Sequence, residues 1–202
     1  RLSGGLFAQL LGALGGSRQY KKSTFLLNSI DQIVIPESLS LFEQPFAKKT
    51  LGAKAFDRDG VLKREQYFVK DGRVKSYVMG QYSANQLGLK TTANAGGTNN
   101  VSVTANFDGG LEAMIKAMGK GLVVTELMGQ GVNATTGDYS RGALGFWVEN
   151  GEIQYPVSGL TIAGNLKDML LGIEHVGTDI DQRSNLKVGS VLVNQMTIAG
   201  ES

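Results

Sequence analysis

His175 is the most versatile chemical group in the chain, because it is the only histidine and because Asp179 and Asp181 follow it closely. An imidazole beside carboxylates could bind a metal ion or move a proton near neutral pH. A catalytic zinc site, however, needs about three protein ligands and an open position for water. We therefore expect His175 to be an ordinary, partly exposed residue of a strand or loop.

Ser140 lies in a polar segment, Thr-Gly-Asp-Tyr-Ser-Arg-Gly, that also contains Asp138 and Arg141. A serine nucleophile needs a base within hydrogen-bonding reach. His175 is the only imidazole available, and nothing in the spacing places it beside Ser140. The chain has no cysteine, which excludes disulfides, a thiol nucleophile and any cysteine-ligated metal site. The residue types therefore assign no catalytic residue.

Three loops match ligand-binding motifs only in part. Residues 95–100 are glycine-rich but lack the Lys-Ser/Thr pair of a phosphate-binding loop, and Gly129 with Gly131 lacks the third glycine of a dinucleotide site. Residues 57–60 lack the spaced acidic ligands of a calcium loop. We expect turns at all three places. Solvated loops explain the two pairs of closely spaced aspartates, which are Asp57 with Asp59 and Asp179 with Asp181.

Two Asx-Gly pairs predict β-hairpins, because a two-residue type I′ turn needs positive φ at both central positions. Residues 67–75, around the first pair, match residues 146–154, around the second, in the order of residue types. An internal duplication and two independent hairpins explain this match equally well. Each pair stands between two β-favouring runs. Asp71-Gly72 lies between residues 63–70 and 73–79. Asn150-Gly151 lies between residues 143–148 and 153–155.

The rest of the chain predicts short helices and strands. Leucines at helical spacing predict a first helix that ends at Gly15-Gly16. Hairpins mixed with a few helices, without regular βαβ alternation, indicate an α+β fold with mainly antiparallel sheet, in one domain over residues 1–202. Further helices are expected at residues 83–87, 110–118 (capped by Asp108 or Gly109) and 165–172 (capped by Asn165), and further strands at residues 24–27, 33–35, 122–124, 187–193 and 195–198.

Composition limits the classes of partner. The net charge is +2, and basic residues cluster only at residues 18–22 and 63–64, which we interpret as solvated surface. This is too little for a nucleic-acid-binding face. No apolar run approaches the roughly 20 residues that cross a bilayer. We expect a cytoplasmic protein without direct contact to nucleic acid or membrane.

Three long segments carry a resemblance to a known family. They read GLVVTELMGQGV at residues 121–132, TGDYSRGALGFWVENGEIQYPV at residues 136–157 and IAGNLKDM at residues 162–169. Through them the chain resembles the C-terminal part of the TldD/PmbA family of bacterial metalloproteases, also called modulators of DNA gyrase. The resemblance implies that an N-terminal half is absent from this chain. Because the charge pattern gives no support for DNA contact, any link to gyrase is expected to be indirect.

The resemblance also says where a metal would be held. In the catalytic members, a helix carries a His-Glu-x-x-x-His motif that binds zinc, and a further ligand lies near the C-terminus. By resemblance, Phe7 and Gly12 stand at the histidine positions here, and Ala8 stands at the glutamate position. Residues 185–189, in the downstream ligand region, contain no cysteine or histidine. We therefore expect no catalytic and no metal-binding residue in this chain, and no peptide-binding residue can be assigned.

Three functions remain open. The resemblance implies the non-catalytic subunit of a heterodimeric zinc metalloprotease, in which a TldD-type subunit supplies the zinc and unfolded peptides are processed or degraded. An alternative is a self-associating peptide-binding or structural module without proteolysis, which a stable homodimer would favour. The third is a metalloprotease in its own right, against which the missing metal motif counts. In the first two, this chain itself holds no cofactor.

Overall fold

A computed structural model describes residues 2–200 of the chain. Short helices alternate with mainly antiparallel strands, which confirms the expected α+β fold. The helices are α1 (Leu2–Ala13), α2 (Gly16–Tyr20), α3 (Gln81–Leu87), α4 (Leu111–Met118) and α5 (Leu166–Leu171). The strands are β1 (Leu41–Glu43), β2 (Gln66–Lys70), β3 (Arg73–Val74), β4 (Val101–Val103), β5 (Gly121–Met128), β6 (Asp138–Glu149), β7 (Glu152–Asn165), β8 (Ile173–Val176), β9 (Leu186–Lys187), β10 (Val191–Val193) and β11 (Thr197–Gly200).

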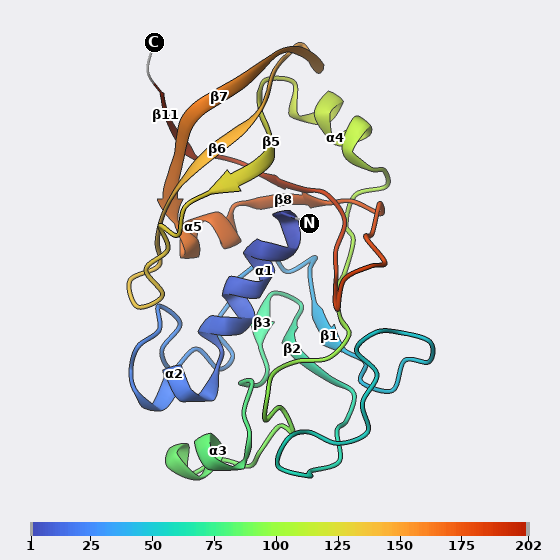
Figure 1. Ribbon diagram of the computed structural model, residues 1–202, viewed down its shortest axis with the longest axis vertical. Coiled ribbons are helices and arrows are strands. Elements are labelled where there is room, and N and C mark those ends of the chain that lie inside the picture. The colour runs from blue at the N-terminus through green and yellow to red at the C-terminus, as the bar shows by residue number, and fades with distance from the viewer. Residues whose placement is uncertain (1, 201–202) are drawn as a thin grey trace.

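Two sheets lie on either side of α1. A four-stranded sheet, in the order β11-β7-β6-β5, stands at the top of Figure 1, and a five-stranded sheet, in the order β3-β2-β1-β4-β9, lies below. A small pair, β10-β8, completes the set. Every strand pair is antiparallel except β4 with β9, which brings the C-terminal part of the chain to the lower sheet. This parallel pair matters because it places residues 186–187 near α1.

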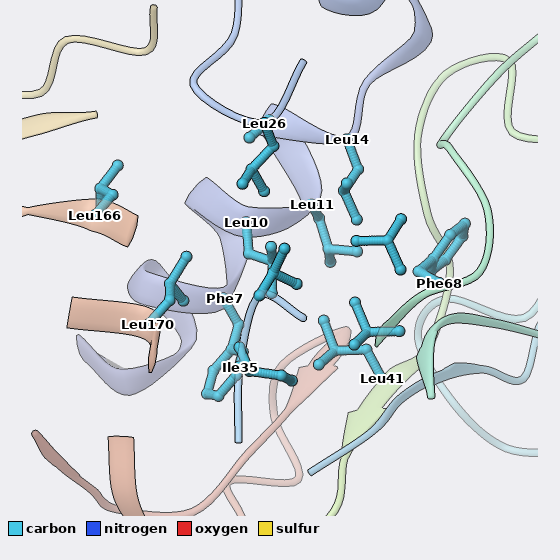
Figure 2. Close-up of a cluster of buried hydrophobic side chains, with 14 of the residues drawn as sticks. Phe7, Leu10, Leu11, Leu14, Leu26, Ile35, Leu41, Phe68, Leu166 and Leu170 are labelled. Carbon is cyan, nitrogen blue, oxygen red and sulfur yellow. The ribbon is translucent and has the colours of Figure 1, made fainter. Parts of the chain in front are cut away.

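The hydrophobic core is built around α1, which is apolar on most of its circumference, as expected for a helix that is buried. Phe7 and Leu10 have no exposed surface, and the neighbouring side chains of α1 pack with them. Figure 2 shows leucines of α1 between residues of the lower sheet and residues of α5. The helix therefore joins both sheets through one core. The labelled members of this cluster are Phe7, Leu10, Leu11, Leu14, Leu26, Ile35, Leu41, Phe68, Leu166 and Leu170.

Both predicted Asx-Gly hairpins are present. At the β2–β3 turn, Asp71 has φ of 48° and Gly72 has φ of 74°. At the β6–β7 turn, Asn150 has φ of 54° and Gly151 has φ of 74°. Positive φ at both central residues is the signature of a type I′ turn. The two hairpins lie in different sheets.

Several predicted strands are shorter than expected or absent. Residues 24–27 form turns, because the hydroxyl of Thr24 donates to the carbonyl of Ala13 at 2.8 Å and accepts from the backbone N–H of Leu26. Residues 33–35 make only an isolated bridge between Ile33 and Arg73. The run at residues 187–193 divides into β9 and β10, since Gly189 turns the chain against the backbone of Gly177. In these places β-favouring residues are used for burial rather than for strand pairing.

The helix caps were predicted with mixed success. The side chain of Asn165 accepts from the backbone N–H of Lys167 at 3.0 Å, which confirms the predicted N-cap of α5. The cap expected for α4 at Asp108 or Gly109 is wrong, because Gly110 is the N-cap and offers no side chain. Instead, Asp179 from a distant loop accepts from the N–H of Leu111 at 3.2 Å. A cap supplied from outside the helix leaves no local sequence signal.

Candidate functional site

The structure brings α1 and the downstream segment at residues 185–189 together. They meet at the first turn of the helix, where a Cβ added to Gly4 would lie 4.0 Å from Cγ1 of Val188. A cleft of about 90 Å³ opens at this junction. The two segments that the family resemblance singled out are therefore neighbours in space, although about 180 residues separate them in the chain. The cleft is lined by Ser3, Gly4, Asp181, Ser184, Leu186 and Val188.

Two polar side chains of this cleft, Asp181 and Ser184, already have hydrogen-bond partners. Arg183 donates to both carboxylate oxygens of Asp181, from Nε at 2.9 Å and from a terminal nitrogen at 3.0 Å. These charge-assisted bonds hold the pKa of Asp181 well below its usual range. The hydroxyl of Ser184 accepts from the N–H of Leu186 at 3.1 Å. Asp181 is thus an ionised partner of arginine.

The three positions that align with the metal motif point in different directions. Phe7 is fully buried in the core, whereas Ala8 and Gly12 are exposed. Neither an aromatic ring nor a glycine offers an atom that could bind zinc. Within residues 2–200, no group of three or more histidine, cysteine, aspartate or glutamate side chains could hold a metal ion. The residues present therefore do not fit a zinc centre.

His175 and the nearby aspartates are not brought together as a site. His175 lies half-buried in β8, where its ring packs on Phe107 with centroids 4.6 Å apart. Asp179 accepts from the N–H of Ser190 at 2.8 Å and from its hydroxyl at 2.7 Å, in addition to capping α4. Within residues 2–200, His175 forms no salt bridge with either aspartate. Asp179 thus ties loops together.

Ser140 has no base beside it in the part of the chain that the structure describes. It lies exposed in β6, while His175 lies in a different sheet. The carboxylate of Asp138 instead accepts from the hydroxyl of Thr136 at 2.6 Å and from the amide of Asn165 at 3.3 Å. This segment therefore closes the loop before β6.

The sequence missed a buried polar network, because Lys63 was interpreted as solvated surface. Its ammonium group is buried 3.4 Å from the carboxylate of Glu43, which has no exposed surface. Lys63 also donates to the carbonyl of Ala93 at 2.8 Å, and the amide of Asn94 donates to both oxygens of Glu43 at 3.0 Å. Backbone and amide donors satisfy the carboxylate, which is what allows the charge to be buried. The network connects β1, the segment before β2 and the loop before β4.

Asp57 and Asp59 also have structural partners. Asp57 accepts from the backbone N–H groups of Asp59 and Val61, both at 2.9 Å, and of Ala95 at 3.0 Å. Burial would raise the pKa of Asp57, but these three hydrogen bonds outweigh it and lower the pKa. Asp59 accepts from the N–H of Gln81 at the start of α3. The expected solvated loop is thus a turn fastened to the glycine-rich loop.

The fold and these segments can be compared with known proteins. A family model described as the PmbA/TldA metallopeptidase C-terminal domain matches residues 1–200. This chain belongs to the PmbA/TldD family. The family is described as one of metallopeptidases.

Relatives of the PmbA branch are similar over almost the whole chain. The metalloprotease PmbA of Escherichia coli O157:H7 is 54% identical over 98% of this chain and 44% of its own length. A structure of a candidate modulator of DNA gyrase from Bacteroides thetaiotaomicron superposes with a TM-score of 0.92 at 28% identity, over 97% of this chain and 44% of that one. The structure of TldE from Thermococcus kodakarensis superposes with a TM-score of 0.83 at 27% identity, over 98% of this chain and 48% of that one. The chain thus spans less than half the length of these relatives.

Among the helices of residues 2–200, none combines the length and the apolar character required to cross a membrane.

Proposed function

We propose that this chain is part of the non-catalytic subunit of a two-part zinc metalloprotease of the TldD/TldE type. A TldD-type subunit would supply the zinc, and the pair would process or degrade unfolded peptides in the cytoplasm. The observation that carries the proposal is the complete burial of Phe7 in the core. The resemblance implies that α1 corresponds to the zinc-binding helix of the catalytic members, and the first histidine position of that helix is here Phe7, whose ring has no exposed surface.

Packing gives a reason why the helix is kept without the metal. Phe7 and Leu10 anchor α1 between the two sheets, so loss of the helix would remove the centre of the core. Replacing Phe7 with an imidazole would bury a polar group among leucines without a partner, which costs free energy. In a two-subunit enzyme, one subunit can lose the chemistry as long as its fold still completes the assembly. The similarity to a TldE supports this division of labour.

A self-associating module without proteolysis is the second candidate, and β5 favours it. This strand has eight residues and pairs, among residues 2–200, with β6 alone. The edge of β5 that faces away from β6 therefore offers backbone N–H and C=O groups, for example at residues 122–124. Such an edge can add a strand from a peptide or from a second copy of the chain.

Metal content and peptide hydrolysis separate these functions. The full-length protein is assayed alone, with a TldD-type partner that carries the His-Glu-x-x-x-His motif, and with the same partner after its motif glutamate is changed to glutamine. Under the proposal, this protein alone binds no stoichiometric zinc and cleaves no unfolded peptide, and activity appears only with the intact partner.

Stoichiometric zinc together with hydrolysis by this protein alone would overturn the proposal and make it an enzyme in its own right. A stable homodimer that ignores the partner in light scattering would favour the second candidate.

A further inference from the structure

A small hollow opens between two loops beside the five-stranded sheet. One loop belongs to the long irregular connection from β1 to β2, and the other is the glycine-rich loop before β4 (Figure 1). The hollow has a volume of about 120 Å³. We call it the basic hollow. Its lining residues are Lys54, Phe56, Asp57, Arg58, Ala95, Gly96 and Asn99.

The lining of the basic hollow has a net positive charge, because it contains two cationic side chains and one carboxylate. Lys54 and Arg58 form no salt bridge with any residue in the range 2–200. Asp57 is the only acid in the lining, and its carboxylate is used by the three backbone N–H groups described above. The two cations therefore remain available to a ligand, while the carboxylate of Asp57 is held in the wall by backbone N–H groups.

The side chain of Arg58 lies against a glycine. The side chain lies across Gly96, where an added Cβ would be 2.6 Å from Cδ of Arg58 and 2.7 Å from its Nε. Gly96 has φ of 90°, a left-handed conformation that other residues rarely adopt. The absence of a side chain at this position is thus what lets the arginine lie flat along the loop.

The opposite wall is fixed by the buried network. The backbone N–H of Asn99 donates to Glu43 at 2.6 Å, and the amide of Asn94 binds the same carboxylate. The side-chain amide of Asn99 makes no hydrogen bond of its own within the described chain, so it too is available. A wall that is already ordered lowers the entropic cost of binding a ligand.

We propose that the basic hollow binds a carboxylate group of a peptide, with Arg58 and Lys54 as its cationic ligands and Asn99 as an amide donor. The planar guanidinium matches the two oxygens of a carboxylate better than a point charge does. The hollow accommodates one such group, whereas pockets for whole small molecules begin at roughly 300 Å³. Phe56, which is 57% exposed, offers an apolar surface for a neighbouring side chain of the peptide.

The choice of a peptide as the source of the carboxylate rests on the proposed function. The preference for a carboxylate rests on the lining residues alone. The carboxylate could be the C-terminal group or an aspartate or glutamate side chain. We therefore design the test around three probes that differ only in this group.

The probes are heptapeptides of alanine and leucine that carry an uncharged BODIPY dye at the N-terminus, so the label adds no carboxylate. One has a free C-terminus, one is C-terminally amidated, and one is amidated with a central glutamate. Binding to the full chain is measured by fluorescence anisotropy at low ionic strength. We expect at least one carboxylate peptide to bind about tenfold more tightly than the uncharged amide, because a charge-assisted bidentate contact is lost in the amide.

Variants identify the site. Arg58→Gln is expected to lower the affinity for the carboxylate peptide about tenfold, and Lys54→Gln to lower it less, because Lys54 lacks the planar fork. Lys167→Gln removes an exposed charge on α5 and is expected to leave binding unchanged. Equal binding of all three probes, or unchanged binding to Arg58→Gln, would overturn the proposal. Displacement of the probe by inorganic phosphate at a lower concentration than by acetate would overturn the carboxylate preference.

This test is independent of proteolysis. It uses no zinc-bearing partner and no hydrolysis, so a failure to activate such a partner leaves the binding result standing. Conversely, absence of carboxylate binding would leave the role of a partner subunit untouched.

Discussion

At the scale of single residues, Phe7 and Gly12 make opposite contributions within one helix. Phe7→Ala removes a fully buried ring and should lower the free energy of unfolding by about 3–5 kcal/mol. Gly12→Ala adds a methyl group that meets no atom within 4 Å and should raise it by about 0.5–1 kcal/mol. Urea unfolding of both variants measures the two effects. A cost below 1 kcal/mol for Phe7→Ala would contradict the packing role given to this residue.

Asp179 should make stability depend on acid pH. Burial would raise its pKa, but hydrogen bonds from Ser190 and from the N–H of Leu111 lower the pKa below 3.8. A carboxyl group with a lowered folded-state pKa contributes stability above its unfolded pKa of about 3.9, and that contribution is lost as pH falls through the folded value.

We therefore expect Asp179→Ala to be about 1 kcal/mol less stable than the parent at pH 7, the usual effect of losing a helix cap. The difference should shrink as the pH falls below about 4. Thermal unfolding at pH 7, 5 and 3 checks this. A difference that stays constant over this range would mean that the charge of Asp179 is not what caps α4.

At the scale of elements, the β6–β7 turn depends on a glycine for two reasons. Gly151 has φ of 74°, and an added Cβ would lie 3.1 Å from Cα of Lys116 in α4. Gly159 has φ of 67° but meets nothing within 4 Å. Gly159→Ala should therefore cost only the left-handed strain, about 1 kcal/mol, whereas Gly151→Ala should cost clearly more. Chemical unfolding compares the pair, and equal costs would show that α4 gives way without penalty.

The Glu43–Lys63 pair should behave as a unit that joins three elements. Removing either charge alone leaves the other buried without its partner, which typically costs about 3–5 kcal/mol. The double variant Glu43→Leu with Lys63→Met should cost less than the sum of Glu43→Leu and Lys63→Met alone, because no unpaired charge is left. A double-mutant cycle measures this coupling. Additive costs would mean that the amide donors, rather than Lys63, satisfy the buried carboxylate of Glu43.

At the scale of the whole molecule, one core should give one unfolding transition. Trp147 is the only tryptophan and lies in the upper sheet, so its fluorescence reports on that sheet, whereas far-ultraviolet circular dichroism reports on the whole chain. Because α1 packs toward both sheets, the two signals should change at the same urea concentration. This checks the prediction of a single domain. An earlier change in fluorescence would show that the upper sheet unfolds by itself.

Local signals predicted much of this architecture. The Asx-Gly pairs located both hairpins, Asn165 located the start of α5, and apolar spacing located α1, because turn and cap chemistry acts between residues that are close in the chain. Features that need distant partners were missed. Asp179 caps α4 from 68 residues away, and no local pattern records that contact.

At the candidate site, too, local features were predictable and features that need distant partners were not. That Phe7 and Gly12 bind no metal is a prediction from residue type, since neither side chain offers a ligand atom. The burial of Lys63 was not predictable, because its two partners, Glu43 and the carbonyl of Ala93, come from other parts of the chain. The basic hollow was missed for the same reason, since Arg58 and Gly96 meet only after two loops fold together.

The packing of α1 against α5 has a consequence for synthesis on the ribosome. The leucines of α1 are made about 160 residues before Leu166 and Leu170, which share their cluster. At 5–20 residues per second, roughly 10–30 s pass before those partners exist. During this interval the apolar surface of α1 has no complete native cover, so nascent chains should engage holding chaperones such as those that bind exposed leucine-rich segments. Ribosome-bound chains stalled before and after residue 171 should differ in chaperone crosslinking, with the longer chain protected.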